Sequence, residues 1–149
     1  MDRLEILMVE DNAGDMVLLD EGFVQAGVAY HISVATDGVE AIEFLRRQGA
    51  YAQAPRPDAI VLDLKLPRKG GREVLAELAL APDLRDIPVV VLSSSQSELE
   101  VVRSQHPSGG VCIAKPSTFA GYVEIARTII ALAQPLGTMA GSPPPTTRG

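Results

Sequence analysis

Short apolar runs alternate along the chain with longer segments whose apolar residues recur at helical spacing. The expected strands cover residues 4–9, 30–35, 60–62, 87–92 and 111–114. The expected helices lie between residues 12 and 27, 37 and 49, 70 and 82, 97 and 106, and 117 and 133. This alternation predicts an α/β fold, a doubly wound parallel sheet with the flavodoxin-like strand order 2-1-3-4-5.

The third expected strand is the most informative segment. Ile60, Val61 and Leu62 form a continuous apolar run, typical of a strand buried on both faces of a parallel sheet. The run ends at Asp63, and Pro67 prevents further strand pairing. Asp63 is therefore expected at the carboxyl end of a central strand, where such sheets bind their ligands. A purely structural Asp63 would need hydrogen-bond donors that its apolar neighbours do not supply.

Several helix boundaries carry local signals. Asn12, Asp37 and Ser117 are expected N-caps, and Gly27 is expected to end the first helix. Ser95 is a fourth candidate N-cap, which Glu98 three residues later would extend to a capping box.

Composition indicates one globular domain. The chain has 149 residues, of which 46% are hydrophobic and 21% charged. Residues 1–134 are expected to form this domain. Residues 135–149 are rich in Pro, Gly, Ser and Thr, which predicts an extended, mobile tail unless a partner orders it.

Charge and hydropathy exclude several classes. A net charge of −6 argues against a nucleic-acid surface. The N-terminal segment lacks the layout of a signal peptide, and no apolar run approaches membrane length. The lone cysteine, Cys112, excludes a disulfide framework. We expect a cytoplasmic protein that binds neither nucleic acid nor membrane.

Polar residues from separate segments converge in the predicted topology. Strands one, three, four and five share one carboxyl edge, so the residues that follow them should lie close together. These residues are Glu10, Asp11, Asp63, Ser93 and Lys115. Each alone could be an ordinary surface or turn residue, but their joint position at one edge favours a functional site.

The charges of this cluster suggest a cation and a phosphate. Glu10, Asp11 and Asp63 oppose one another's ionisation when crowded. Hard oxygen ligands suit Mg²⁺, with Mn²⁺ as an alternative, and the absence of histidine argues against zinc. With the metal bound, Asp63 could act as a nucleophile towards a phosphoryl group, while Ser93 and Lys115 stabilise the phosphoryl oxygens.

The combination of Glu10-Asp11, Asp63 with Pro67, Ser93, and Lys115-Pro116 resembles the receiver domain of two-component response regulators, over about residues 4–133. The resemblance implies phosphotransfer to Asp63 from the phosphohistidine of a sensor histidine kinase. It also implies that Asp11, Asp63 and the backbone carbonyl of Lys65 hold Mg²⁺, with Glu10 acting through a metal-bound water. In the family the bond matching Lys115–Pro116 is cis.

Longer phrases point to one branch of this family. The segments ILMVEDNAGD and IPVVVLSSS, and the connection at residues 50–57, are similar to the single-domain regulators paired with bacterial and cyanobacterial phytochromes. The resemblance therefore implies a bacteriophytochrome-like kinase as partner. No DNA-binding module is expected after residue 133, so transcriptional output is not supported.

Three alternatives remain at this point. The fold could serve as an adaptor that works unphosphorylated, although the intact set of site residues argues against it. A phosphohydrolase with an aspartyl nucleophile would need a second Asp two residues after Asp63, where the sequence has Lys65. A flavin-binding domain would need a phosphate-cradling loop after the first strand, which is acidic here.

Two further features shape the expected output. Cys112 stands where many receivers have an aromatic residue that reports phosphorylation, and it is expected to be a small buried strand residue. The last helix is apolar nearly all round, with a second apolar stripe formed by Ile125, Leu132 and Leu136. This pattern predicts a homodimer through that helix, or else extra core beneath the tail.

Overall fold

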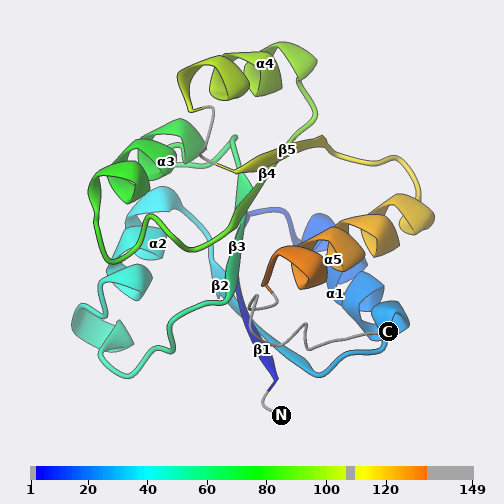
Figure 1. Ribbon diagram of the computed structural model, residues 1–149, viewed down its shortest axis with the longest axis horizontal. Helices are drawn as coiled ribbons and strands as arrows, with labels where there is room; N and C mark the ends of the chain where they lie inside the picture. The colour runs from blue at the N-terminus through cyan, green and yellow to red at the C-terminus, as the bar shows by residue number, and fades with distance from the viewer. Residues whose placement is uncertain (1–2, 107–109, 134–149) are drawn as a thin grey trace, which may run out of the picture.

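The five strands form one parallel sheet in the order β2-β1-β3-β4-β5. This computed structural model describes residues 3–106 and 110–133. The strands are β1 (Leu4–Val9), β2 (Tyr30–Ala35), β3 (Ala59–Asp63), β4 (Val89–Ser93) and β5 (Val111–Ala114). The predicted fold class and strand order are confirmed (Figure 1).

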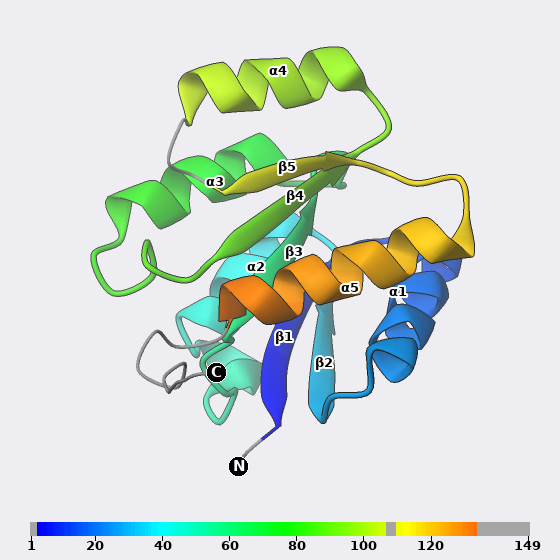
Figure 2. The same ribbon diagram turned by 45° about the vertical axis from the view of Figure 1, so that its right-hand side comes forward.

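Helices cover both faces of the sheet. They are α1 (Ala13–Ala26), α2 (Gly38–Leu45), α3 (Gly71–Leu80), α4 (Gln96–Gln105) and α5 (Phe119–Ala133), with a short 3₁₀ helix, η1 (Gly49–Tyr51). Helices α1 and α5 lie side by side on one face, and α2 and α3 cover the other, with α4 beyond them near β4 and β5 (Figures 1 and 2). Over residues 3–106 and 110–133, none of these helices has the length and apolar character needed to cross a bilayer.

The sheet separates two apolar cores. Every residue of β3 and of β4 is buried, as their continuous apolar runs predict. Leu7, Ile60 and Val91 point into the core beneath α2, α3 and α4, whereas Ile6, Val61 and Val90 point into the core beneath α1 and α5. The alternation along each strand thus fixes which side chains meet which helices, and leaves the polar residues at the strand ends.

Local capping signals set most helix boundaries. The Asn12 side chain accepts a hydrogen bond from the Asp15 backbone at 2.9 Å, and Asp37 accepts one from Glu40 at 2.8 Å. Gly27 ends α1 in the left-handed conformation, with φ of 79°. The N-cap predicted at Ser117 is wrong: α5 begins at Phe119, and the Thr118 hydroxyl accepts the hydrogen bond from Gly121 at 3.1 Å.

The bond between Lys115 and Pro116 is trans, and no cis peptide bond occurs at residues 3–106 or 110–133. The expected cis bond is therefore wrong for this structure. Trans is the lower-energy isomer of X-Pro bonds in general. Lys115 reaches the carboxyl edge of the sheet from this trans geometry, as described below.

Helix α5 is more asymmetric than its sequence predicts. Ile125, assigned above to a second outward stripe, is buried in the core beneath α1 and α5. The large apolar side chains that α5 exposes are Phe119, 42% exposed, and Leu132, 37% exposed. Leu136 and the tail at 135–149 lie outside the described residues. The continuous second stripe is therefore not present, because the sheet and α1 together take up Ile125.

The segment that connects β3 to α3 is fastened to the start of α2. The Gly38 backbone N–H donates to the Lys69 carbonyl at 3.1 Å, and Arg68 forms an ion pair with Asp37 at 2.7 Å. A side chain at position 38 would collide with the Lys69 carbonyl oxygen, so glycine is required at this close approach. The connection that follows Asp63 is thereby held against α2.

Candidate functional site

Three acidic residues meet at the carboxyl edge of the sheet. Glu10 directly follows β1 and is 3% exposed, and Asp63 ends β3 and is 4% exposed, whereas Asp11 is exposed. One carboxylate oxygen from each of the three lies within 4.8 Å of the others. The convergence expected from the order of strands β1 and β3 is therefore present in the structure.

The crowding of these acids changes the ionisation of Glu10. Burial, followed by the hydrogen bond and the charge of Asp63, raises the pKa of Glu10 to about 7, although the Lys115 charge and the Asn12 backbone N–H act in the opposite direction. A carboxyl group with this pKa is partly protonated near neutral pH. The site thus has more acid groups than its own positive charge can compensate.

Lys115 supplies that positive charge. Its Nζ lies 3.0 Å from Asp63 Oδ2 and 3.5 Å from Glu10 Oε1. The lysine follows β5, and its backbone N–H donates to the Ser93 carbonyl at 2.9 Å, which directs the side chain along the carboxyl edge. Burial alone would lower the pKa of Lys115, but hydrogen bonds to Asp15 and Asp63 raise it, so the amine stays charged.

Asp15 is a site residue that the sequence did not identify. Its Oδ2 accepts a hydrogen bond from Lys115 Nζ at 2.7 Å, and its Oδ1 accepts one from the Tyr122 hydroxyl at 3.2 Å. Asp15 lies in the first turn of α1, which begins at the carboxyl edge of β1. That position is the signal that could have revealed it, because the first turn of such a helix overhangs the same edge as the strand ends.

Ser93 lies at the end of β4, next to the acids, and it is buried. Its Oγ donates to Glu98 Oε1 at 2.9 Å and accepts from the Ser95 backbone N–H at 3.0 Å. Only half of the capping box predicted for Ser95 and Glu98 is present: the Glu98 N–H donates to Ser95 Oγ at 3.2 Å, but the Glu98 carboxylate binds Ser93. Glu98 is the second site residue that the sequence analysis missed.

A cavity of about 190 Å³ opens between these groups. Its walls come from the ends of β1, β3, β4 and β5 and from the start of α4: Asp11, Asn12, Asp63, Lys65, Ser93, Ser94, Ser95, Glu98 and Lys115. The Lys65 backbone N–H donates to Asp63 Oδ1 at 3.0 Å, so both oxygens of the Asp63 carboxylate are oriented. The mostly polar lining of the cavity suits an ion and a phosphoryl group.

The donor set fits a hard divalent cation. Three carboxylates approach one another to within 4.8 Å, and Lys115 compensates only part of their charge. Oxygen ligands with room for water are what Mg²⁺ and Mn²⁺ prefer. Asp11, which is exposed, and Asp63, which is buried, line the cavity, and Glu10 lies beside them.

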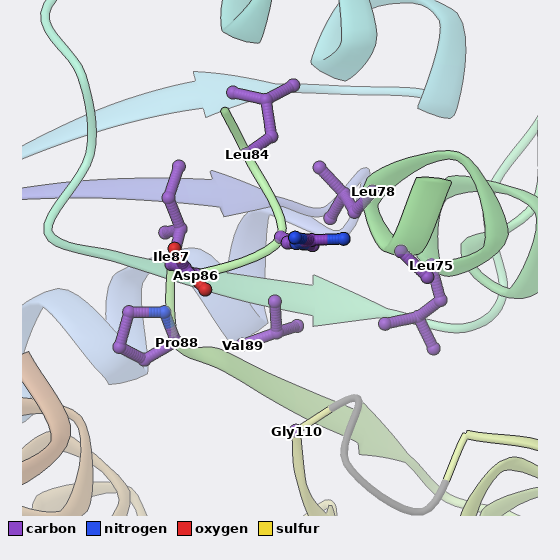
Figure 3. A pocket seen from close by; sticks show the side chains of 10 residues that line it. Leu75, Leu78, Leu84, Asp86, Ile87, Pro88, Val89 and Gly110 are labelled. Carbon is purple, nitrogen blue, oxygen red and sulfur yellow. The ribbon is translucent and has the colours of Figure 1, made fainter. Parts of the chain in front are cut away.

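A larger cavity, of about 450 Å³, lies at the opposite end of β4 (Figure 3). Leu75 and Leu78 of α3 face Ile87 and Val89 across it, and Gly110 before β5 closes one side. The cavity contains none of the predicted site residues.

Comparison with known proteins identifies the family of this chain. The family model for the response regulator receiver domain matches residues 6–127. The chain belongs to this family. Receiver domains are phospho-accepting signalling domains, and the fold resemblance noted from the sequence is therefore confirmed.

Two relatives of this receiver domain are response regulators themselves. Response regulator Rcp1 of Synechocystis sp. (strain ATCC 27184 / PCC 6803 / Kazusa) is 46% identical over 99 residues, which cover 66% of this chain and 67% of Rcp1. The crystal structure of the phosphorylated cyanobacterial phytochrome response regulator RcpA is 41% identical, with a TM-score of 0.77, and covers 86% of this chain and 91% of RcpA.

A third comparison bears on the metal. The Mn²⁺-bound form of Rcp1 is 38% identical to this receiver domain, with a TM-score of 0.76 and coverage of 86% of this chain and 92% of that one. A divalent metal is thus bound by a relative with the same fold. In this receiver domain, carboxylate oxygens of Glu10, Asp11 and Asp63 lie within 4.8 Å of one another.

Cys112 of the receiver domain is half-buried, not fully buried as expected. It packs at the border of the core beneath α4, and burial raises the pKa of its thiol, although the charge of Arg103 lowers it. A neutral thiol of this size leaves the space beneath α4 less filled than an aromatic ring would.

Proposed function

We propose that this receiver domain accepts a phosphoryl group on Asp63 from the phosphohistidine of a sensor histidine kinase and signals through protein–protein contacts in the cytoplasm. The observation that carries the proposal is the approach of Lys115 Nζ to Asp63 Oδ2, at 3.0 Å, within a cluster of acids. Similarity to RcpA and Rcp1 supports a phytochrome-like kinase as the donor.

The transfer exchanges one bond for another. An Asp63 carboxylate oxygen attacks phosphorus, an O–P bond forms, and the P–N bond to the donor histidine breaks. The electron pair of that bond stays on the imidazole nitrogen. Carboxylates are weak nucleophiles, so the reaction suits an activated donor such as phosphohistidine.

The residues around Asp63 would divide the remaining tasks. Lys115 lies within reach of an oxygen of a phosphoryl group on Asp63 and would offset its charge. The Ser93 hydroxyl would donate a hydrogen bond to another phosphoryl oxygen. Mg²⁺, or Mn²⁺, would neutralise charge on the acids and on the phosphoryl oxygens. Asp11, Asp63 and the Lys65 carbonyl would hold it, with Glu10 acting through water.

The proposal is tested by intact mass spectrometry. We expect the protein, incubated with Mg²⁺ and acetyl phosphate, to gain the mass of one phosphoryl group, and we expect Asp63→Asn to gain none. Asp58→Asn is a matched control, since Asp58 lies just before the same strand and outside the cavity. A phytochrome-like histidine kinase that carries a radiolabelled phosphoryl group should transfer this group to the wild type and not to Asp63→Asn.

Two results would refute the proposal. An unmodified wild type would favour the adaptor that acts without phosphorylation. Continuous turnover of unrelated phosphoesters, unaffected by a kinase partner, would favour a phosphohydrolase.

We also propose that the receiver domain forms a homodimer through α5 and the adjoining edge strand β5. Phe119 of α5 and Val111 of β5 are exposed, and Val123, Ile130 and Ile113 are half-buried. We infer that together they form an apolar surface near the open edge of the sheet. Sedimentation velocity should show a dimer at micromolar concentration for the wild type and a monomer for Phe119→Glu.

Leu80→Glu is the matched control for this test. Leu80 is the most exposed large apolar residue described and lies on α3, away from α5. If both variants sediment as monomers, the association of the wild type is non-specific. If Phe119→Glu sediments with the mass of the wild type, the proposal of a dimer through α5 is wrong.

A further inference from the structure

The Ser93 hydroxyl is held by two groups of the β4–α4 junction. It accepts from the Ser95 backbone N–H at 3.0 Å and donates its proton to Glu98 Oε1 at 2.9 Å. A hydroxyl carries a single proton and can donate only one hydrogen bond. While Glu98 holds that proton, Ser93 has none to offer to a phosphoryl oxygen on Asp63.

Glu98 has a second donor within its own helix turn. Ser95 is the N-cap of α4 and Glu98 is three residues on, and the Glu98 N–H already donates to Ser95 Oγ at 3.2 Å. A complete capping box adds a bond from the N-cap backbone N–H to the carboxylate of the residue three positions later. Here that N–H, of Ser95, donates to Ser93 instead.

The two arrangements exclude each other. If Ser93 turns towards Asp63, the Glu98 carboxylate loses a donor and the Ser95 N–H loses an acceptor. These two groups are the missing halves of the capping box, so they can satisfy each other. The junction thus has two arrangements in which Ser95 and Glu98 are both hydrogen-bonded.

A phosphoryl group would favour the second arrangement. Glu98 and Asp63 line the same cavity of about 190 Å³, so negative charge added at Asp63 would repel the Glu98 carboxylate. The phosphoryl oxygens would also be strong acceptors for the Ser93 proton. Both effects move Glu98 away from Ser93 and towards the N-cap.

We propose that Glu98 is a positioning residue that holds the Ser93 hydroxyl away from Asp63 in the unphosphorylated protein, and that phosphorylation transfers Glu98 from Ser93 to the Ser95 N–H. This inference rests on the proposed phosphorylation of Asp63. This change of hydrogen-bond partner would transmit the phosphorylation of Asp63 to the first turn of α4. It would not need an aromatic residue at the position of Cys112.

Helix α4 can respond to one exchanged bond because little else fixes it. Among the described residues, it buries only Leu99 and Val102. Its C-terminal half is joined to its neighbours by a bond of 2.9 Å from Arg72 to Gln105 and one of 3.3 Å from Arg103 to the Cys112 carbonyl. The capping bonds are therefore a large share of what holds its first turn.

The test compares Glu98→Ala with Glu100→Ala, which removes an exposed carboxylate from the same helix. Ser95 amide hydrogen exchange is followed by NMR, with Mg²⁺ and with or without beryllofluoride, a mimic of the phosphoryl group on aspartate. In the wild type and Glu100→Ala, the Ser95 amide should stay protected in both states. In Glu98→Ala, beryllofluoride should speed its exchange up to about tenfold, because both acceptors are then lost.

Phosphorylation by acetyl phosphate provides the second measurement. Glu98→Ala should react about three- to tenfold faster than the wild type, since the Ser93 proton is free, and Glu100→Ala should react at the wild-type rate. Glu98→Gln keeps an acceptor oxygen for Ser95 while losing the charge. It should therefore keep the Ser95 amide protected with beryllofluoride, as the wild type does. Glu98→Met, which also lacks an acceptor oxygen, replaces Glu98→Ala if that variant does not fold.

The proposal is overturned if Glu98→Ala matches Glu100→Ala in both measurements while the wild type is phosphorylated. A wild type that gains no phosphoryl group, as Asp63→Asn should gain none, would instead overturn the proposed function itself.

Discussion

Helix α5 buries Tyr122, Ile125, Ala126, Ile129 and Ala133, whereas α4 buries only Leu99 and Val102 among the described residues. The two helices lie on opposite faces of the sheet (Figure 2). Helix α5 packs along the length of α1, and α4 contacts mainly β4 and β5. The α5 side of the site is therefore fixed by apolar packing, and the α4 side is fixed mainly by a few hydrogen bonds.

This difference assigns separate tasks to the two sides. Lys115 and the acids are supported through Asp15, which Tyr122 ties to the well-packed α5. Ser93 and Glu98 are supported by α4, whose attachment is weaker. The packed side suits residues that must keep a fixed geometry around a metal and a phosphate, and the α4 side suits a change of conformation.

The largest expected effect is on the free energy of unfolding, when a core residue beneath each of the two helices is truncated. Ile129→Ala should lower the free energy of unfolding by about 2–5 kcal/mol, because Ile129 is fully buried between α5, α1 and the sheet. Leu99 is equally buried, but the cost of Leu99→Ala should be smaller, because α4 can detach locally before the sheet unfolds. Urea unfolding followed by circular dichroism measures both.

Hydrogen exchange sharpens this comparison. Leu99→Ala should accelerate amide exchange in α4 alone, and Ile129→Ala should accelerate it throughout the domain. Equal unfolding costs together with equal exchange patterns would show that α4 and α5 belong to one cooperative unit.

The next effect concerns the acids on the packed side. The pKa of Glu10 is raised to about 7 from its ordinary 4.5, so Glu10 favours the folded state fully below pH 4.5, and this contribution is lost as the pH rises through about 7. The melting temperature of the metal-free protein should therefore rise as the pH is lowered from about 8 to about 6. Differential scanning fluorimetry measures the trend.

Glu10→Gln is the control, since it removes the group that titrates. Its melting temperature should depend less on pH over this range. Saturating Mg²⁺ should also weaken the trend in the wild type, because the ion favours the ionised acids. A wild type and variant with the same pH dependence would contradict the role assigned to Glu10.

The smallest expected effect concerns Asp15. Asp15→Asn keeps the shape of the side chain but removes the charge that pairs with Lys115, which should cost about 1 kcal/mol of unfolding free energy. It should also slow phosphorylation by acetyl phosphate, since Lys115 loses one of its anchors. Asp20→Asn on the same helix, which does not contact Lys115, is the control. An unchanged rate in Asp15→Asn would limit Asp15 to a structural role.

Sequence patterns predicted most of the fold because its signals are local. The fully buried runs of β3 and β4, the caps at Asn12 and Asp37, and Gly27 each depend on residues a few positions apart. The strand order then brought Glu10, Asp11 and Asp63 to one edge, as topology alone predicts.

Contacts between distant segments were not predictable in this way. The bond from Lys115 to Asp15 joins residues 100 positions apart, and no local pattern encodes it. Glu98 was assigned to a local capping box, but a buried hydroxyl on the neighbouring strand end binds its carboxylate instead. Ile125 was assigned to an outward stripe because the helix pattern could not show that α1 and the sheet cover it from two directions.

The close approach of Gly38 to the Lys69 carbonyl decides where a fluorescent label can detect activation of this protein. Since the connection after Asp63 is clamped to α2, a dye attached to α2 should report almost nothing when the protein is activated. A dye at an exposed site on α4, such as position 100, should change its fluorescence on phosphorylation instead. The labelled receiver domain would then serve as a fluorescent sensor of kinase activity.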